Sequence, residues 1–320
     1  MMNALRFDGT TLAVEQQQIP EDADECVIRV VRSGICNTDL EIVSGYAGFT
    51  GTIGHEFSGI VDSSPGRPEL VGRRVVGEIN VGCGNCKVCS TGDERHCPNR
   101  TVLGIKGRDG AHAEYLTLPA RNLSEIPANV SDDEAVFAEP LAAAYGITEQ
   151  VTIDNDSKVA VIGDGKLGIL CIRSFSGLPG ELVLIGKHAE KLELGKKSGA
   201  EGVHYSDTAK LAGRFDVVVE VSGSESGFAA AVDMVRPRGK IVLKSTFHGR
   251  PSWEAWRVVV DEITIVGSRC GRFGPALELL AAGKVDVKDL ISERFDLSDG
   301  VKAIETAGRG GVMKVLLNNN

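Results

Sequence analysis

Residues 158–168 read KVAVIGDGKLG, a short apolar strand pattern that leads directly into a glycine-rich turn. The turn fits G-x-G-x-x-G and opens a stretch of helical character, which is the context that a dinucleotide-binding turn requires. The first glycine permits the tight turn, the second admits a pyrophosphate, and the third lets helix and strand pack closely. An ordinary glycine turn is the alternative. We expect the cofactor phosphates at this helix start, in contact with Gly163, Gly165, Lys166, Leu167 and Gly168.

Apolar strand patterns and helical patterns alternate along the chain after this turn. Apolar strands in such alternation are typical of a parallel, doubly wound sheet. The preceding ~140 residues hold short β-rich runs between glycines and prolines, as in a barrel-like β region. The sequence therefore predicts an α/β sheet domain with strands at 158–162, 182–185, 217–220, 240–243 and 263–266 and helices at 166–175, 189–198 and 225–235.

The composition is that of a globular protein with more than one domain. Of 320 residues, 42% are hydrophobic and 25% charged, which argues against long disordered stretches. A net charge of −9 without a basic run argues against nucleic-acid binding. No apolar stretch reaches the roughly 18 residues of a membrane span, and the start, MMNALRFDGT, does not read as a secretory signal. We expect a cytoplasmic protein that contacts neither nucleic acid nor membrane.

The end of the second strand bears on the choice of cofactor. An NAD site usually carries Asp or Glu about 20 residues beyond the glycines, where it binds the ribose 2′-OH. Here the strand ends in Gly186, which is followed by Lys187 and His188. A glycine removes the repulsion that a 2′-phosphate would meet, and the two basic residues can pair with that phosphate. The sequence thus favours NADP over NAD, unless Lys187 is only a solvated surface lysine.

Four of the eight cysteines fall within one glycine-rich segment, as Cys83-x2-Cys86-x2-Cys89-x7-Cys97. Four thiolates at such spacing can surround one tetrahedral zinc ion as a closed structural site. Iron–sulfur ligation also uses Cys-x2-Cys steps, so the spacing alone leaves both metals open. Four unconnected cysteines are an improbable reading. A nucleic-acid zinc ribbon would need a more basic surrounding segment.

A second set of metal-ligating residue types is dispersed along the chain. It comprises Cys36, the adjacent His55 and Glu56, and Glu139. Taken singly, each has an ordinary structural explanation. A lone cysteine is most often a small core residue, a lone histidine is often a satisfied core residue, and a carboxylate near a helix start is favoured by the helix dipole.

Several motifs in one order resemble the zinc-containing medium-chain alcohol dehydrogenases. They are GICNTD at 34–39, GHEFSG at 54–59, the four-cysteine segment, and VIGDGKLG at 161–168. The resemblance spans nearly the whole chain. It implies a GroES-like, β-rich catalytic domain made of 1–141 and 275–320, with a structural zinc lobe at 80–100. A Rossmann domain with a doubly wound parallel sheet would occupy 142–274.

The resemblance also assigns roles to residues. Cys36 and His55 match ligands of a catalytic Zn²⁺, and Glu56 matches an acidic neighbour that ligates directly or in exchange with water. Glu139 matches a position that is glutamate in the polyol and sugar branch, and Thr38 matches the residue that passes a proton from the substrate hydroxyl. A structural Zn²⁺ would be held by Cys83, Cys86, Cys89 and Cys97.

Two departures from the family limit what the resemblance transfers. Glu41 stands where some members carry a proton-relay histidine, and the interval between Cys36 and His55 is short. The proton route beyond Thr38 and the substrate therefore stay open. Family segments that line the cofactor also match here, and Arg269 has a structural salt bridge as its alternative role. The matching residues are Ser222, Ser245, Thr246 and Arg269 at the nicotinamide and Lys314 near the pyrophosphate.

The sequence thus predicts an NADP-linked zinc enzyme that oxidises a small alcohol, polyol or sugar, or reduces the corresponding carbonyl. A zinc-independent quinone or enone reductase of the same superfamily is one alternative, although such proteins lack the zinc ligands. A non-catalytic, NADP-binding zinc protein is another. The resemblance implies a homo-dimer or homo-tetramer.

Overall fold

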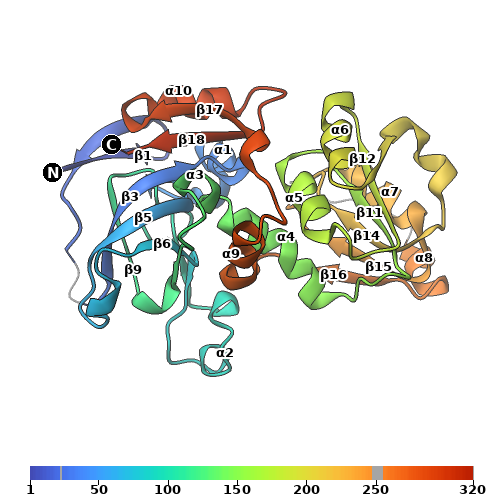
Figure 1. The fold of residues 1–320 in the computed structure, drawn as a ribbon, viewed down its shortest axis with the longest axis horizontal. Coiled ribbons are helices and arrows are strands. Elements are labelled where there is room, and N and C mark those ends of the chain that lie inside the picture. The colour runs from blue at the N-terminus through green and yellow to red at the C-terminus, as the bar shows by residue number, and fades with distance from the viewer. Residues whose placement is uncertain (22–23, 247–254, 320) are drawn as a thin grey trace. The chain divides into compact units, whose positions relative to one another are not determined.

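The computed structural model describes residues 1–21, 24–246 and 255–319. The chain forms two compact units (Figure 1). Unit 1 comprises Met1–Glu139 and Phe273–Asn320, and unit 2 comprises Pro140–Arg272. None of the described helices is both long and apolar enough to cross a membrane.

Unit 2 is built on a parallel sheet with the strand order β13-β12-β11-β14-β15-β16. This is the order of two mononucleotide-binding halves that meet between β11 and β14. The bounds are β11 (Lys158–Ile162), β12 (Glu181–Gly186), β13 (Glu201–His204), β14 (Phe215–Glu220), β15 (Val235–Leu243) and β16 (Thr264–Gly267). The predicted doubly wound sheet is confirmed. The edge strand β13 went unpredicted because its sequence, EGVH, contains only one apolar side chain.

One helix precedes the first strand of this sheet and the others follow its strands, as the alternation in the sequence predicted. They are α4 (Ala138–Gln150), α5 (Lys166–Phe175), α6 (Ala189–Lys197), α7 (Glu225–Met234) and α8 (Ala255–Val260). Helix α5 packs on β11 and β12, and α7 packs on β14 and β15. The start of α7 is capped by Ser224, whose side chain accepts a hydrogen bond from the backbone of Gly227 at 3.0 Å. A buried core that includes Phe215, Phe228 and Met234 fills the layer between α7 and the sheet.

Unit 1 is rich in short strands. Its largest sheet has the order β10-β6-β5-β3-β18-β17, with β9 also paired to β3, and smaller sheets join β2-β1-β4 and β7-β8. The bounds are β1 (Met2–Phe7), β2 (Leu12–Gln17), β3 (Cys26–Gly34), β4 (Gly51–Thr52), β5 (Glu56–Ser63), β6 (Arg74–Gly77), β7 (Asn80–Val81), β8 (Thr101–Val102), β9 (Tyr115–Leu118), β10 (Leu123–Glu125), β17 (Ile291–Asp296) and β18 (Lys314–Asn318).

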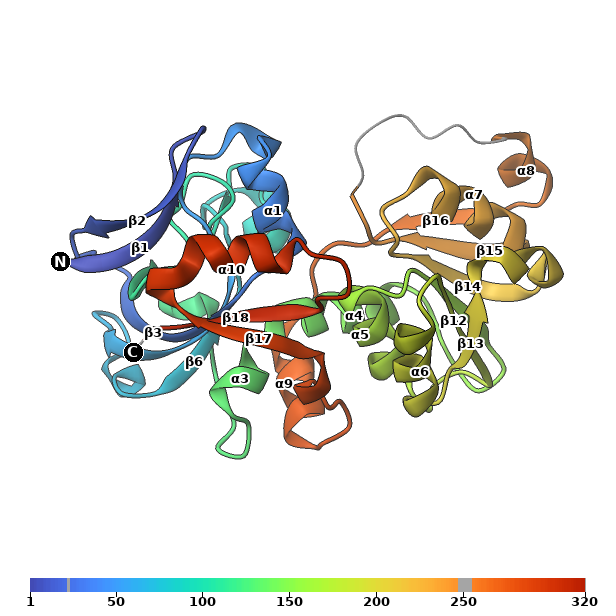
Figure 2. The same cartoon turned by 90° about the horizontal axis from the view of Figure 1, so that it is seen from above.

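The last part of the chain completes the sheet of unit 1. Strand β18 pairs antiparallel with β3, where Leu316 lies opposite Gly34. Helix α10 lies along β17 and β18, as Figure 2 shows. The helices of unit 1 are α1 (Asn37–Val43), α2 (Lys87–Ser90), α3 (Asp132–Ala135), α9 (Phe273–Ala281) and α10 (Gly300–Ala307).

Candidate metal centres and cofactor site

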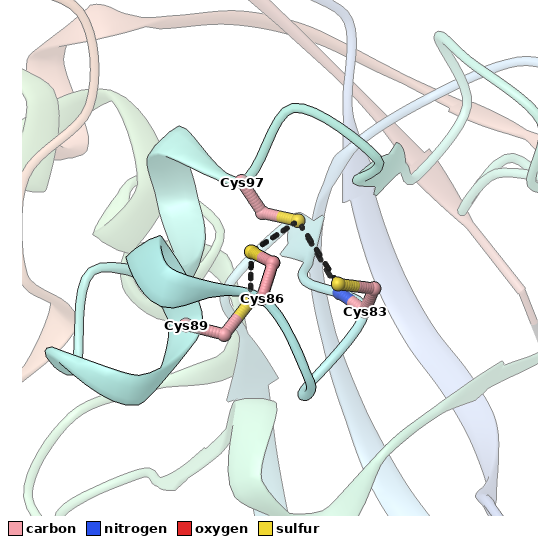
Figure 3. Close-up of side chains that lie close together, drawn as sticks. All are labelled: Cys83, Cys86, Cys89 and Cys97. Atoms are coloured by element: carbon pink, nitrogen blue, oxygen red, sulfur yellow. Dashed lines mark hydrogen bonds between the residues drawn. The ribbon is translucent and has the colours of Figure 1, made fainter.

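The four clustered cysteines converge in the lobe around α2. Figure 3 shows their sulfur atoms turned toward one another from the loop before α2, from α2 itself and from the segment that follows. The Sγ–Sγ distances are 3.5 Å for Cys97–Cys83, 3.6 Å for Cys86–Cys89 and 3.7 Å for Cys86–Cys97. A tetrahedron with Zn–S bonds of about 2.3 Å has edges of about 3.8 Å. The donor set and its spacing therefore fit a four-thiolate zinc ion.

One of these thiols is already favoured as a thiolate. A backbone N–H of Asn85 and the Cys97 thiol stabilise the charged form and lower the pKa of Cys83 to about 6. Burial acts in the opposite direction on Cys89 and raises the pKa of its thiol to about 12. A bound divalent cation would favour the deprotonated form of all four ligands.

The second candidate metal site, formed by Cys36, His55 and Glu56, lies in unit 1 where β3 ends and β5 begins. Cys36 stands between β3 and α1, whereas His55 and Glu56 stand at the start of β5, so the antiparallel pairing of β3 and β5 brings them together. One ligand atom from each lies within 4.8 Å of the others. Nδ1 of His55 and Oε1 of Glu56 are buried and make no hydrogen bond among the described residues. Thiol, imidazole and carboxylate form a suitable donor set for a zinc site with an open position.

Asp39 supports this group, and the sequence analysis did not single it out. Its carboxylate is fully buried and accepts hydrogen bonds from the backbone N–H of Cys36 at 2.7 Å and of Gly54 at 3.2 Å. It lies 3.5 Å from Nδ1 of His55 and, on its other oxygen, 3.5 Å from Nε2 of His112. A carboxylate behind a ligating histidine fixes the orientation of the ring. The signal available in the sequence was the acidic residue three positions after Cys36.

The electrostatic surroundings of this group favour a cation. Burial alone would lower the pKa of His55, but the Asp39 carboxylate and the sulfur of Cys36 raise it well above its usual value. Burial likewise would raise the pKa of Asp39, yet His55 and His112 hold it far below its usual range. The same negative surroundings that stabilise an imidazolium would stabilise a divalent cation at this place.

Lys314 lies beside Glu56 in the interior of unit 1. The family resemblance predicts that this lysine lies near the cofactor pyrophosphate. In the structure its ammonium group is fully buried and forms an ion pair with Oε2 of Glu56. Nζ also lies 3.4 Å from the carbonyl oxygen of Ile35 and 5.5 Å from the centre of the Phe137 ring. In this position the charge of Lys314 compensates the buried carboxylate, and its contact with the cofactor stays a prediction.

Two further predicted residues lie in the same part of unit 1. Thr38 is in the first turn of α1, and its hydroxyl accepts a hydrogen bond from the Cys36 thiol at 3.8 Å. Glu139 lies in the first turn of α4 and is not part of the close group of three ligand atoms. Although part of its surface is accessible, burial raises the pKa of Glu139 to about 7, against the lowering effect of His55. Zinc ligation by Glu139 stays a prediction.

The glycine-rich turn after β11 has the geometry that a dinucleotide needs. Gly163 has a φ of 122°, and a Cβ there would lie 2.8 Å from the backbone nitrogen of Ser222. A Cβ on Gly168 would lie 1.9 Å from the carbonyl oxygen of Gly163, so helix and strand touch at that point. Gly165, the N-cap of α5, is exposed and faces open space. Lys166 and Leu167 are the first two residues of α5, and the N–H groups at a helix start can bind the oxygen atoms of a phosphate.

The end of β12 has a neighbour that its sequence did not reveal. A Cβ on Gly186 would lie 2.4 Å from Oδ2 of Asp164, the residue between the first two glycines. That oxygen accepts hydrogen bonds from the backbone N–H of Lys187 and of His188, both at 2.8 Å, and from the His188 ring at 3.0 Å. Gly186 itself carries no carboxylate, as its sequence position indicated, but the carboxylate of Asp164 lies beside it. Lys187 and His188 themselves are exposed.

The remaining predicted cofactor residues follow β14, β15 and β16. Ser222 and Ser245 share a buried partner that the sequence analysis missed. The Glu220 carboxylate accepts from the Ser222 backbone N–H at 2.7 Å and from the Ser245 hydroxyl at 2.9 Å. Thr246 and Arg269 are exposed and lie just beyond the ends of β15 and β16. All four stand at the carboxyl edge of the parallel sheet, where ligands of such folds bind.

Comparison with known proteins agrees with this geometry. Residues 22–128 match the family model described as alcohol dehydrogenase GroES-like domain, and residues 167–282 match the one described as zinc-binding dehydrogenase. The chain is 30% identical to a sorbitol dehydrogenase from Halalkalibacterium halodurans, over 95% of both chains.

Two solved structures share the fold over nearly the full length. One is described as a zinc-binding dehydrogenase from Sinorhizobium meliloti 1021 bound to NADP, with a TM-score of 0.91, 28% identity and 99% of each chain covered. The other is the RspB alcohol dehydrogenase from Escherichia coli CFT073 complexed with NADH, with a TM-score of 0.92, 28% identity and 99% of each chain covered. With two zinc-type donor sets and a dinucleotide turn on such a fold, the chain belongs to the zinc-containing medium-chain alcohol dehydrogenase family and is an NAD(P)-linked oxidoreductase.

Proposed function

We propose that this protein oxidises a secondary alcohol of a polyol or sugar, with NADP as cofactor, and that it also catalyses the reverse reduction. The observation that carries the proposal is the group of half-buried Cys36 and buried His55 and Glu56, whose ligand atoms lie within 4.8 Å of one another. Together with Glu139 these residues would hold a catalytic zinc ion. When bound, zinc polarises the substrate oxygen, and the nicotinamide exchanges a hydride with the carbon.

The residues of unit 1 have distinct tasks in this reaction. Asp39 holds the His55 ring by its charge and fixes the start of α1 through the backbone N–H of Cys36. The Thr38 hydroxyl, beside the Cys36 sulfur, would hydrogen-bond the substrate oxygen and pass on its proton. Lys314 neutralises the charge of Glu56 when that carboxylate does not ligate zinc. The presence of this donor set speaks against the zinc-independent quinone or enone reductase, since such proteins lack these ligands.

The choice of a polyol or sugar rests on Glu139 and on the relatives. The family's polyol branch carries glutamate at this position, and the similar protein from H. halodurans is named for sorbitol. As an ionised carboxylate, Glu139 has two acceptor oxygens, so it can ligate zinc through one and accept a hydrogen bond from a substrate hydroxyl through the other.

The proposal of NADP rests on the exposed basic pair Lys187 and His188 at the end of β12. In a doubly wound sheet this strand end receives the adenosine ribose. A 2′-phosphate there would gain charge-assisted hydrogen bonds from both side chains.

We also propose that the protein forms a homo-oligomer through a surface of unit 2. Helix α8 exposes the large apolar side chains Trp256, Val259 and Val260. Within the described part of the chain, β16 pairs with β15 alone, so its outer edge is open to another strand. An open edge beside an apolar patch suits a homo-dimer or homo-tetramer. Cytoplasmic location stays a prediction from the sequence.

Turnover and metal content together test the proposal. The purified protein should contain zinc and reduce NADP when offered sorbitol, xylitol or related polyols. Cys36→Ala should abolish turnover while leaving NADPH binding, measured by calorimetry, within about threefold of the wild type. Full activity of this variant would refute the zinc assignment. A protein that binds NADPH but turns over no alcohol or carbonyl would instead be the non-catalytic zinc protein.

A further inference from the structure

Asp164 has a role that neither the glycine pattern nor the family resemblance assigns. We propose that Asp164 is a positioning residue for NADP selectivity, because it holds the segment Lys187–His188 so that both basic side chains face the 2′-phosphate. The inference rests on the proposed use of NADP and concerns unit 2 alone.

The contacts of Asp164 are concentrated on one oxygen. Oδ2 accepts from the backbone N–H of Lys187 and of His188 and from the His188 ring. Two successive backbone donors on one carboxylate fix the path of the chain as it leaves β12. They also stabilise the charged form, so that the pKa of this carboxyl is lowered although burial alone would raise it. Asp164 is thus an anion whose charge is matched by donors before any ligand arrives.

Gly186 and Asp164 form a matched pair. The three atoms nearest to a Cβ built on Gly186 all belong to the Asp164 side chain, at 2.4 to 2.6 Å. A side chain at the strand end and the Asp164 carboxylate therefore compete for one space. The glycine at this position is explained by that competition, and it leaves the ribose region without a carboxylate that projects from the strand itself.

The arrangement prepares both basic side chains for an anion. An ionised carboxylate only accepts hydrogen bonds, so the His188 ring donates from Nδ1, and its Nε2 is left for a ligand. A ring that carries both protons can donate from Nε2 to a phosphate oxygen while Nδ1 donates to Asp164. Nζ of Lys187 lies 5.2 Å from the centre of the Tyr205 ring, and the Tyr205 hydroxyl donates to the carbonyl oxygen of Ser226 at 2.9 Å. The Lys187 ammonium group therefore lies over an aromatic ring whose position is fixed by a hydrogen bond of its own.

A competing role for Asp164 predicts the opposite selectivity. If the carboxylate accepted a ribose hydroxyl directly, it would act as the usual acidic residue of an NAD site and would repel a 2′-phosphate. Removal of its charge would then weaken NADH binding and strengthen NADPH binding. The positioning role predicts weaker NADPH binding and little change for NADH.

The test is calorimetric binding of NADPH, NADH, adenosine 2′,5′-bisphosphate and AMP to the full chain and to Asp164→Ala. We expect the variant to bind NADPH and the bisphosphate about tenfold more weakly, while NADH and AMP change by less than about threefold. Asp164→Asn keeps the size and one acceptor oxygen, so it should fall between the wild type and Asp164→Ala. Glu190→Gln is the matched control, because it removes an exposed carboxylate from the first turn of α6.

The outcomes separate this inference from the proposed function. Equal weakening of NADPH and NADH, an unchanged preference, or tighter NADPH binding in Asp164→Ala would each overturn the positioning role. A wild type that prefers NADH would overturn it together with the proposed NADP preference, with the dehydrogenase assignment intact. Failure of the wild type to bind any of the four ligands would count against the proposed function itself. If Asp164→Ala does not fold, the same comparison is decided with Asp164→Asn.

Discussion

Lys314 and Glu56 form an ion pair in the interior of unit 1, where their side chains are 0% and 1% exposed. The pair joins β18, near the end of the chain, to the start of β5, across 258 positions of sequence. A buried charge without its partner is costly, so each of these residues depends on the other.

Replacement of Lys314 by methionine should destabilise unit 1 by about 3–5 kcal/mol, because the Glu56 carboxylate would stay buried without a counter-charge. Urea unfolding, followed by far-ultraviolet circular dichroism, measures the change in the free energy of unfolding. Lys302→Met is the matched control, since Lys302 also lies over a phenylalanine ring, Phe295 at 5.6 Å, but is exposed. Equal stability of the two variants would show that the ion pair contributes nothing specific.

Replacement of one of the four lobe cysteines should remove the structural zinc site and leave the candidate catalytic site in place. Cys97→Ala is expected to lower bound zinc by about half, since three thiolates leave a structural zinc site open and weak. Atomic emission on the purified variant gives the metal content. Cys171→Ala serves as the control, because that buried thiol belongs to neither donor set and its pKa is raised by burial to about 12. Unchanged zinc in Cys97→Ala would refute the lobe assignment.

Asp39→Asn should weaken zinc binding at the Cys36 group about 10–100-fold, because the ring of His55 would lose the carboxylate behind it. Competition with a coloured chelator measures the affinity, and zinc in the lobe should not change. Glu41→Gln is the control, because Glu41 lies on the same helix and its carboxylate accepts a hydrogen bond from the Asn37 side chain, so the zinc affinity of this variant should match that of the wild type. If Asp39→Asn kept full affinity, Asp39 would be no more than a helix cap.

The double variant Asp164→Ala with Gly186→Asp should turn the cofactor preference toward NADH. The first change removes the atoms that a side chain at residue 186 would strike, and the second places a carboxylate at the strand end where a ribose 2′-OH is bound. We expect the ratio of NADPH to NADH affinity to fall by about 100-fold, measured by calorimetry. Gly186→Asp alone should fold poorly, because Asp164 still occupies the space. A double variant that still prefers NADPH would show that Lys187 and His188 act without help from this position.

The doubly wound sheet could be predicted because its signals are local. An apolar strand, a glycine turn and a helix lie next to one another in 158–175, and each glycine of the turn has the spatial reason that the pattern implies. The four-cysteine lobe was predictable for the same reason, since its ligands lie close in sequence.

The features that the sequence did not reveal depend on tertiary contacts. Gly186 is a glycine because Asp164 occupies the neighbouring space, and a single sequence does not show which residue across a turn fills a given position. Glu220 and Asp39 look like ordinary acidic residues until their buried donors are seen. The place of Lys314 beside Glu56 follows from the pairing of β18 with β3, which no local pattern indicates.

That pairing also bears on how the chain is made. Unit 2 is one continuous segment and can fold as soon as it has left the ribosome, whereas unit 1 begins to emerge first and is completed last. Lys314 follows Ile35 by 279 residues, which at about 5–20 residues per second is roughly 14 to 56 seconds of synthesis. Throughout that interval the segment Arg32–Gly34 of β3 lacks its partner in β18, and Glu56 lacks its counter-ion. Nascent chains stalled before β18 should therefore be the species that chaperones bind.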